Sequence, residues 1–122
     1  MSVFREKTVA WDGKDYKLVP TMRLLHAIEA GDRSKGIGRI SLAAITSDAA
    51  QGQPQIAKMS HVVELVMRHA GATEFAEDDF YREMASSDPD ARAAAIACWY
   101  DIMEAISPVP KEGKTAAAQD EK

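Results

Sequence analysis

The chain has 122 residues, of which 46% are apolar and 28% charged, and its formal net charge is −4. These values are typical of one soluble globular domain, and no apolar run approaches the roughly 18 residues of a membrane span. The single cysteine, Cys98, excludes an internal disulfide and is typical of a reducing compartment. Residues 1–7 are too polar for a signal peptide, so we expect a cytoplasmic protein.

Charge is unevenly distributed along the chain. Residues 1–40 are net positive, with eight basic and five acidic residues, whereas residues 74–90 hold seven acidic residues and one basic residue, Arg82. An acidic segment repels a phosphate backbone, and the basic residues form no cluster. The distribution therefore disfavours nucleic-acid binding and is typical of the solvated faces of ordinary helices.

The N-terminal segment, residues 1–20, predicts a tight β-hairpin. Asp12-Gly13 provides the positive φ angles that a two-residue hairpin turn needs. Alternation places four large side chains on one face. These are Val9, Trp11, Tyr16 and Leu18. Because two strands alone are barely stable in water, this face must pack on another element, and we expect the helix that follows.

Two helices and a connecting loop are predicted next. The first helix covers Met22 to Ala30, with Thr21 as its N-cap and Gly31 as a left-handed C-cap. Residues 31–38 contain three glycines and predict a flexible connection. The second helix is predicted over about Arg39 to Ala50, because a Gln-Gly-Gln-Pro sequence then interrupts it.

The third helix is the clearest element of the sequence. Its apolar residues recur at spacings of three and four, which defines one face of a helix. They are Ile56, Met59, Val62, Val63, Val66, Met67 and Ala70. Gly71 follows as the C-terminal cap.

Two further helices complete the predicted fold. A short helix from Glu77 to Ala85 begins with three acidic residues, which are favourable at the positive end of the helix dipole. Asp88-Pro89 is a helix-start signal, and the final helix extends to about Ile106. Its predicted buried stripe consists of Ile96, Trp99, Tyr100 and Met103.

The expected architecture is mainly α, with an N-terminal β-hairpin followed by about five helices in a small single-domain bundle. The domain covers residues 1–108. Residues 109–122 lack apolar periodicity, so we predict that they form a disordered tail.

No catalytic or cofactor-binding residue is predicted. Gly31–Gly36 has the outer spacing of a phosphate-binding loop, but Ile37-Gly38 stands where lysine and a hydroxyl residue are required. Cys98 lies in a helix interior between Ala97 and Trp99, so we expect a small core residue and not an activated thiolate.

The three histidines, His26, His61 and His69, do not predict a metal site. His61 and Glu64 lie one helical turn apart, but no second pair at ligand spacing accompanies them. His61 and His69 are too far apart along one helix to share an ion. We expect all three at the surface or half-buried, without a metal.

A partner-binding surface is predicted in and beside the acidic segment. The short helix there has limited capacity to bury four apolar side chains, which are Phe75, Phe80, Tyr81 and Met84. They are either core residues or an apolar patch rimmed with acids, and such a patch suits a protein partner. We take these four as the candidate partner-binding residues.

Three short segments carry a resemblance to a known family. A strand pair around a Gly-Lys-x-Tyr turn covers Trp11–Leu18, a Pro-Thr junction follows at Pro20-Thr21, and the next helix ends as Ile-Glu-Ala-Gly at Ile28–Gly31. This pattern resembles the tail assembly chaperones of long-tailed, siphovirus-type bacteriophages and related gene-transfer particles. The resemblance continues loosely, in length and helical organisation, to about Pro108.

The resemblance implies a non-enzymatic helical protein that acts in the host cell cytoplasm and is absent from the mature particle. Such a protein binds the tape measure protein, keeps it soluble and helps recruit tail-tube subunits. It commonly forms homo-oligomers, and no cofactor, nucleic acid or membrane is expected. Two alternatives are a tail-tube or head–tail connector protein, with strands dominating a tube subunit, and a small nucleic-acid-binding regulator, which should carry a basic recognition helix.

Overall fold

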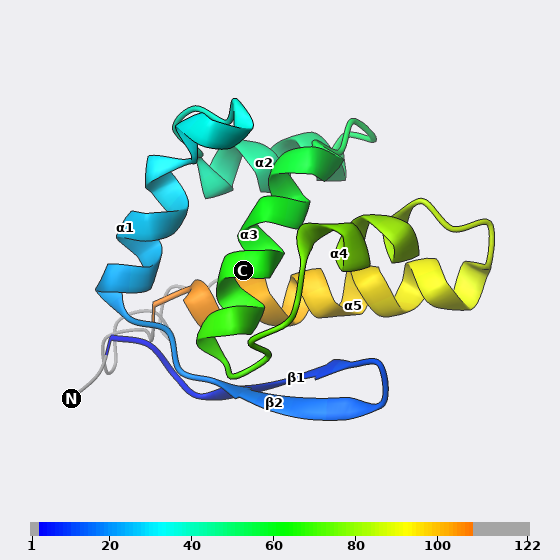
Figure 1. Ribbon diagram of the computed structural model, residues 1–122, viewed down its shortest axis with the longest axis horizontal. Coiled ribbons are helices and arrows are strands. Elements are labelled where there is room, and N and C mark those ends of the chain that lie inside the picture. Colours follow the sequence, from blue (N-terminus) through cyan, green and yellow to red (C-terminus); the bar gives the residue numbers. More distant parts are fainter. Residues whose placement is uncertain (1–2, 109–122) are drawn as a thin grey trace, which may run out of the picture.

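The structure, a computed structural model, describes residues 3–108 and places a hairpin along one edge of a group of helices (Figure 1). In chain order the elements are β1 (Lys7–Trp11), β2 (Lys14–Leu18), α1 (Met22–Ala30), the 3₁₀ helix η1 (Arg33–Lys35), α2 (Leu42–Ala50), α3 (Ile56–His69), α4 (Glu77–Met84) and α5 (Pro89–Ile106). The predicted mainly α fold with its N-terminal hairpin is confirmed. The predicted tail, 109–122, lies outside the described residues.

The hairpin has the predicted turn and the predicted apolar face. Asp12 and Gly13 both have positive φ, at 52° and 77°, as a two-residue turn between twisted strands requires. Val9 lies opposite Tyr16 in the antiparallel register. Val9 and Leu18 are fully buried, and Trp11 and Tyr16 are partly buried against the same core.

The hairpin face packs on α5 and α3, so the prediction that it covers the next helix, α1, was wrong. β1 lies against α5 and β2 against α3. The Lys7 ammonium donates to Glu104 Oε1 at 2.9 Å, which joins β1 to the last turns of α5. His69 Nε2 donates to the Val19 carbonyl oxygen at 2.9 Å and holds the chain after β2 against the end of α3. The chain then continues into α1, which packs against α3.

The loop between α1 and α2 is ordered by its own backbone, although the sequence predicted a flexible connection. Asp32 and Ile37 exchange two N–H to carbonyl hydrogen bonds of 2.9 Å and enclose η1 between them. The Asp32 carboxylate also accepts the Ser34 N–H at 3.0 Å and the Ser34 hydroxyl at 2.6 Å. The loop is therefore a small hydrogen-bonded unit.

The second helix begins at Leu42, three residues later than predicted. Ser41 is its N-cap, and the Ser41 hydroxyl accepts the Ala44 N–H at 3.2 Å. The residues before it are used to join α1, because the Ile40 N–H donates to the Glu29 carbonyl at 3.0 Å and the Ile40 side chain is buried.

Helix α3 is the centre of the core, and its predicted apolar stripe is confirmed. β2, α1, α4 and α5 all pack against it. Its fully buried side chains are Val62, Val63, Val66 and Met67. Packing from four directions also encloses the polar residues Ser60 and His61, which are 3% and 2% exposed.

The start signals of the last two helices are confirmed. The Asp79 carboxylate accepts the Ala76 N–H at 2.9 Å at the beginning of α4. The Asp88 carboxylate accepts the Asp90 N–H at 3.0 Å, and Pro89 is the first residue of α5. Both arrangements satisfy backbone donors that a helix terminus leaves without partners.

The buried face of α5 differs from the predicted stripe. Trp99 is buried as predicted and Met103 partly so, but Ile96 and Tyr100 are 43% and 61% exposed. The buried side chains of α5 are Ala95, Cys98, Trp99, Ile102, Ala105 and Ile106. The side of α5 that β1 and α4 cover therefore includes small residues that the predicted stripe left out.

Gly31 leads to the first prediction, because the chain at this position has room for no side chain. Its φ is +71°, and a Cβ there would lie 2.0 Å from the Gly38 carbonyl oxygen. We expect Gly31→Ala to lower the free energy of unfolding by about 3 kcal/mol, since the backbone must move. Urea denaturation followed by circular dichroism measures this loss.

Gly36→Ala is the comparison variant, since Gly36 has ψ 19°, in the left-handed helical region, whereas Gly31 has ψ −159°, in a region that alanine avoids. Gly36 has nearly the same φ, +73°, but a Cβ there would meet open space. Its loss should be only about 1 kcal/mol, the cost of left-handed backbone for an alanine. Equal losses in the two variants would contradict a steric role for the contact between Gly31 and Gly38.

Candidate functional site

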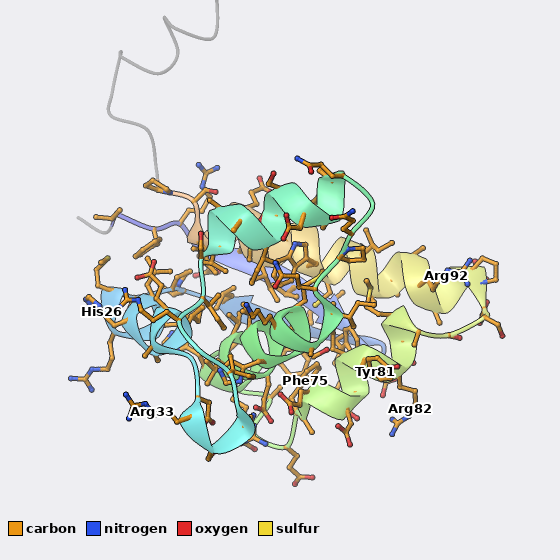
Figure 2. The ribbon with its side chains drawn as sticks, turned by 90° about the horizontal axis from the view of Figure 1, so that it is seen from above. His26, Arg33, Phe75, Tyr81, Arg82 and Arg92 are labelled. Carbon is orange, nitrogen blue, oxygen red and sulfur yellow. The ribbon has the colours of Figure 1, made fainter. Side chains whose placement is uncertain are left out.

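The four predicted partner-binding residues do not share one surface. Phe75 and Phe80 are 6% and 0% exposed, whereas Tyr81 is 54% exposed and Met84 is partly buried. The Trp11 ring covers both phenylalanines, edge-on to Phe75 with centroids 5.2 Å apart and stacked on Phe80 at 6.1 Å. Tyr81 lies beside Arg82 on α4 (Figure 2). Of the four residues, Tyr81 alone presents most of its side chain to a partner.

An exposed apolar stripe lies on α5 instead. Ala93, Ile96, Ala97 and Tyr100 are all exposed and follow the i, i+3, i+4, i+7 spacing of one helical face. At 100° per residue this face lies opposite the buried one. The helix is therefore apolar on two sides, and one of these sides has no cover among the described residues.

A signal for this stripe was present in the sequence. The eight residues from Ala93 to Tyr100 contain no charge, although a helix with one solvent-facing side normally carries polar residues there. Ile96 and Tyr100 were predicted to lie in the buried stripe of the last helix. The absence of charge from Ala93 to Tyr100, about two helical turns, indicated an apolar side beyond the buried one.

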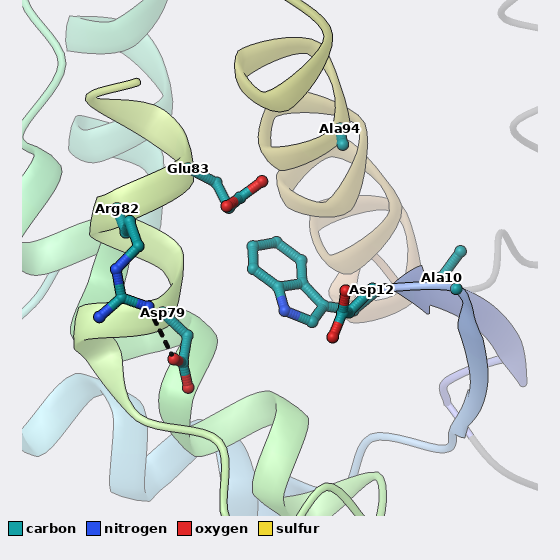
Figure 3. A pocket seen from close by; sticks show the side chains of 8 residues that line it. Ala10, Asp12, Asp79, Arg82, Glu83 and Ala94 are labelled. Atoms are coloured by element: carbon teal, nitrogen blue, oxygen red, sulfur yellow. Dashed lines mark ion pairs between the residues drawn. The ribbon is translucent and has the colours of Figure 1, made fainter. Parts of the chain in front are cut away.

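A cleft of about 440 Å³ lies between the hairpin turn, α4 and α5 (Figure 3). Its lining residues are Ala10, Trp11, Asp12, Gly13, Asp79, Arg82, Glu83 and Ala94. Arg82 is paired with Asp79 at 3.5 Å. The carboxylates of Asp12 and Glu83, on opposite sides of the cleft in Figure 3, make no ion pair with any residue between 3 and 108. The cleft is thus an acidic recess beside Trp11.

A polar cluster lies where η1 meets α3 and α4. The Lys35 ammonium donates to Glu64 Oε1 at 2.8 Å and to Glu77 Oε2 at 3.3 Å, and it lies 3.5 Å from His61 Nδ1. The hydrogen bond to Glu64 is the main reason that the pKa of Lys35 is raised, so this lysine is a cation and no nucleophile at neutral pH. The cluster fastens the ordered loop to two helices.

His61 is buried, whereas the sequence predicted a surface or half-buried residue. Burial lowers the pKa of His61, and the nearby Lys35 ammonium lowers it further. Because the ring is neutral and Nδ1 faces an ammonium donor, the ring proton belongs on Nε2. Nε2 has no hydrogen-bond partner among the described residues.

The same cluster contains the residues that could hold a metal ion. One ligand atom each from His61, Glu64 and Glu77 lies within 4.8 Å of the other two. The His61 and Glu64 pair was recognised from the sequence, whereas Glu77 and Lys35 were not. The spacing of residues in the sequence did not predict this cluster, because Lys35 lies in η1 and Glu77 in α4. Both side chains contact α3 only in the folded chain.

The nucleophile considered from the sequence is inert. The Cys98 side chain is 1% exposed, and burial raises its pKa to about 12, so the thiol stays protonated at neutral pH. Cys98 is the small core residue that was predicted. No helix between residues 3 and 108 is long and apolar enough to cross a membrane.

Comparison of the chain with protein families, curated proteins and solved structures finds no match. An assignment of function therefore rests on the residues of this chain and on their geometry.

The buried His61 leads to a pH prediction. Unfolded His61 takes up a proton near pH 6.5, whereas folded His61 stays neutral to lower pH because its pKa is lowered. Acidification below about pH 6.5 therefore favours the unfolded chain, and this loss of stability continues down to the folded pKa. Urea denaturation at several pH values, with a chelator present, should show a steeper loss in the natural protein than in His61→Gln. Parallel curves would contradict the neutral buried state of His61.

Proposed function

We propose that this protein is a phage tail assembly chaperone, which binds the tape measure protein and helps recruit tail-tube subunits without entering the mature virion. One observation carries the proposal: within residues 3–108, a folded domain with an intact core leaves the α5 stripe of Ala93, Ile96, Ala97 and Tyr100 uncovered. A protein that binds other proteins needs such a surface. The resemblance of the segment from Trp11 to Gly31 supports the same assignment.

The stripe is suited to a helical partner. Ala93 and Ala97 allow the backbone of a second helix to approach closely, and Ile96 and Tyr100 provide side chains that fill its grooves. A tape measure protein is a long helix with exposed apolar residues, which need cover until tube subunits polymerise around it. Removing apolar surface from water on both sides stabilises such a complex.

The acidic cleft provides a second contact of different chemistry. Asp12 and Glu83 flank it without ion-pair partners among the described residues, so a basic side chain of the partner helix would find a complementary charge there. The exposed Tyr81 lies on the same helix as Glu83. Charge would set the orientation of the partner, and apolar burial would provide most of the affinity.

The two alternatives receive less support. A tail-tube subunit should be dominated by strands, and the described residues contain a single two-stranded sheet. A nucleic-acid regulator should present a basic helix, yet α4 carries three acids in its first turn and α5 has Arg92 as its one basic residue.

The stripe leads to a binding prediction. The double variant Ile96→Gln, Tyr100→Gln should bind a tape measure protein of the same phage at least about tenfold more weakly, because interface energy is concentrated in a few large side chains. Both residues are exposed, so the free energy of unfolding should change by less than about 1 kcal/mol. Co-expression and affinity co-purification measure the binding.

Met22→Gln is the matched control, because Met22 is 52% exposed on α1 and lies outside the stripe. A Tyr81→Gln variant tests the acidic segment separately. Undiminished co-purification of the double variant would contradict a docking role for α5, and failure of the natural protein to solubilise the tape measure protein would contradict the chaperone function.

A further inference from the structure

Three potential metal ligands surround one point near the surface of the domain. His61 and Glu64 project from adjacent turns of α3, and Glu77 is the first residue of α4. The Lys35 ammonium occupies the point they share, 2.8 Å from Glu64 Oε1, 3.3 Å from Glu77 Oε2 and 3.5 Å from His61 Nδ1. The folded chain therefore contains a position suited to a cation, and the Lys35 ammonium occupies it.

The geometry points to a binding site for a divalent transition-metal ion, of which zinc is the best match, formed by His61, Glu64 and Glu77 in competition with Lys35. One imidazole and two carboxylates are three of the ligand types that zinc takes, and a water molecule would complete a tetrahedron. Magnesium and calcium fit less well, because they favour all-oxygen shells of six or more ligands. This inference is independent of the proposed function.

The two carboxylates have room to close on a smaller ion. The three ligand atoms now lie within 4.8 Å of one another, whereas ligand atoms about 2 Å from zinc in a tetrahedron are roughly 3.3 Å apart. The Glu77 side chain is 34% exposed and can rotate inward. Arg68 pairs with the other oxygen of Glu64, Oε2, at 3.4 Å, which leaves Oε1 turned toward the site.

His61 distinguishes this cluster from an ordinary surface ion-pair network. Its side chain is 3% exposed, and Nδ1 faces the two carboxylates. Nε2 makes no hydrogen bond within residues 3–108, so the polar contact of the ring to Lys35 is made by Nδ1. With its proton on Nε2, the imidazole directs an unprotonated Nδ1 toward the two carboxylates, and this nitrogen can coordinate a metal without first losing a proton once Lys35 has moved away.

Lys35 is a competitor that can leave. Its side chain is 31% exposed and starts from η1, so the ammonium can move into water while the short helix stays in place. Exchange of one ammonium for a divalent ion leaves two carboxylates, a neutral ring and a dication, with no net charge. Lysine therefore lowers the affinity of the site but does not block it.

The test is a titration of the chelator-treated full chain with zinc chloride, followed by calorimetry, and with cobalt(II), followed by its visible absorption. We expect one ion to bind, and Lys35→Gln to raise the affinity at least about tenfold because the competing cation is gone. Glu77→Gln should lower it by at least about tenfold. Circular dichroism shows whether each variant is folded, and the partly exposed Glu77 makes that variant safer than a change at the buried His61.

His26→Ala is the matched control, because His26 is an exposed histidine outside the cluster. Its affinity for zinc should equal that of the natural protein. The proposal is overturned if neither the natural protein nor Lys35→Gln binds zinc at millimolar concentration. It is equally overturned if binding is lost in His26→Ala or survives unchanged in Glu77→Gln, since the ion would then sit elsewhere.

Discussion

The enclosure of α3 by β2, α1, α4 and α5 is the constraint from which most of this structure follows. A helix packed on so many sides buries its polar residues along with its valines, and a buried polar group that has no partner costs stability. The Ser60 hydroxyl finds a partner within the helix, by donating to the Ile56 carbonyl oxygen at 2.7 Å. His61 has no such local solution, and its Nδ1 edge is met by Lys35 from the ordered loop.

The loop between α1 and α2 and the beginning of α4 provide the polar side chains that lie beside His61 of α3. Gly31 permits a backbone approach to Gly38 that a side chain would prevent, and this tight turn carries η1 back over α3. The Lys35 ammonium then lies between the carboxylates of Glu64 and Glu77 and next to the buried ring of His61. The same packing requirement that covers the core has gathered one imidazole, two carboxylates and a displaceable cation.

Helix α5 shows how a core and a binding surface are divided along one element. The buried side of α5 combines small side chains with Trp99, Ile102 and Ile106, and two further large side chains, Ile96 and Tyr100, are left outside. The buried side chains stabilise the domain by removing apolar surface from water, whereas the exposed apolar side chains contribute in the same way only when a partner covers them. The proposed binding surface is therefore the side of α5 that lies opposite the core.

The order and type of the elements could be read from local features, because caps, turns and apolar periodicity act over a few residues. Asp12-Gly13, Thr21 and Asp88-Pro89 each marked a boundary that the structure retains. Partners of the hairpin, the exposed side of α5 and the surroundings of His61 depend on residues far apart in the chain. The pattern of apolar residues in an element shows that one of its faces is buried, but it does not show which other element covers that face. The encounter of Lys35 with Glu77, 42 positions later, therefore arises only when the helices pack.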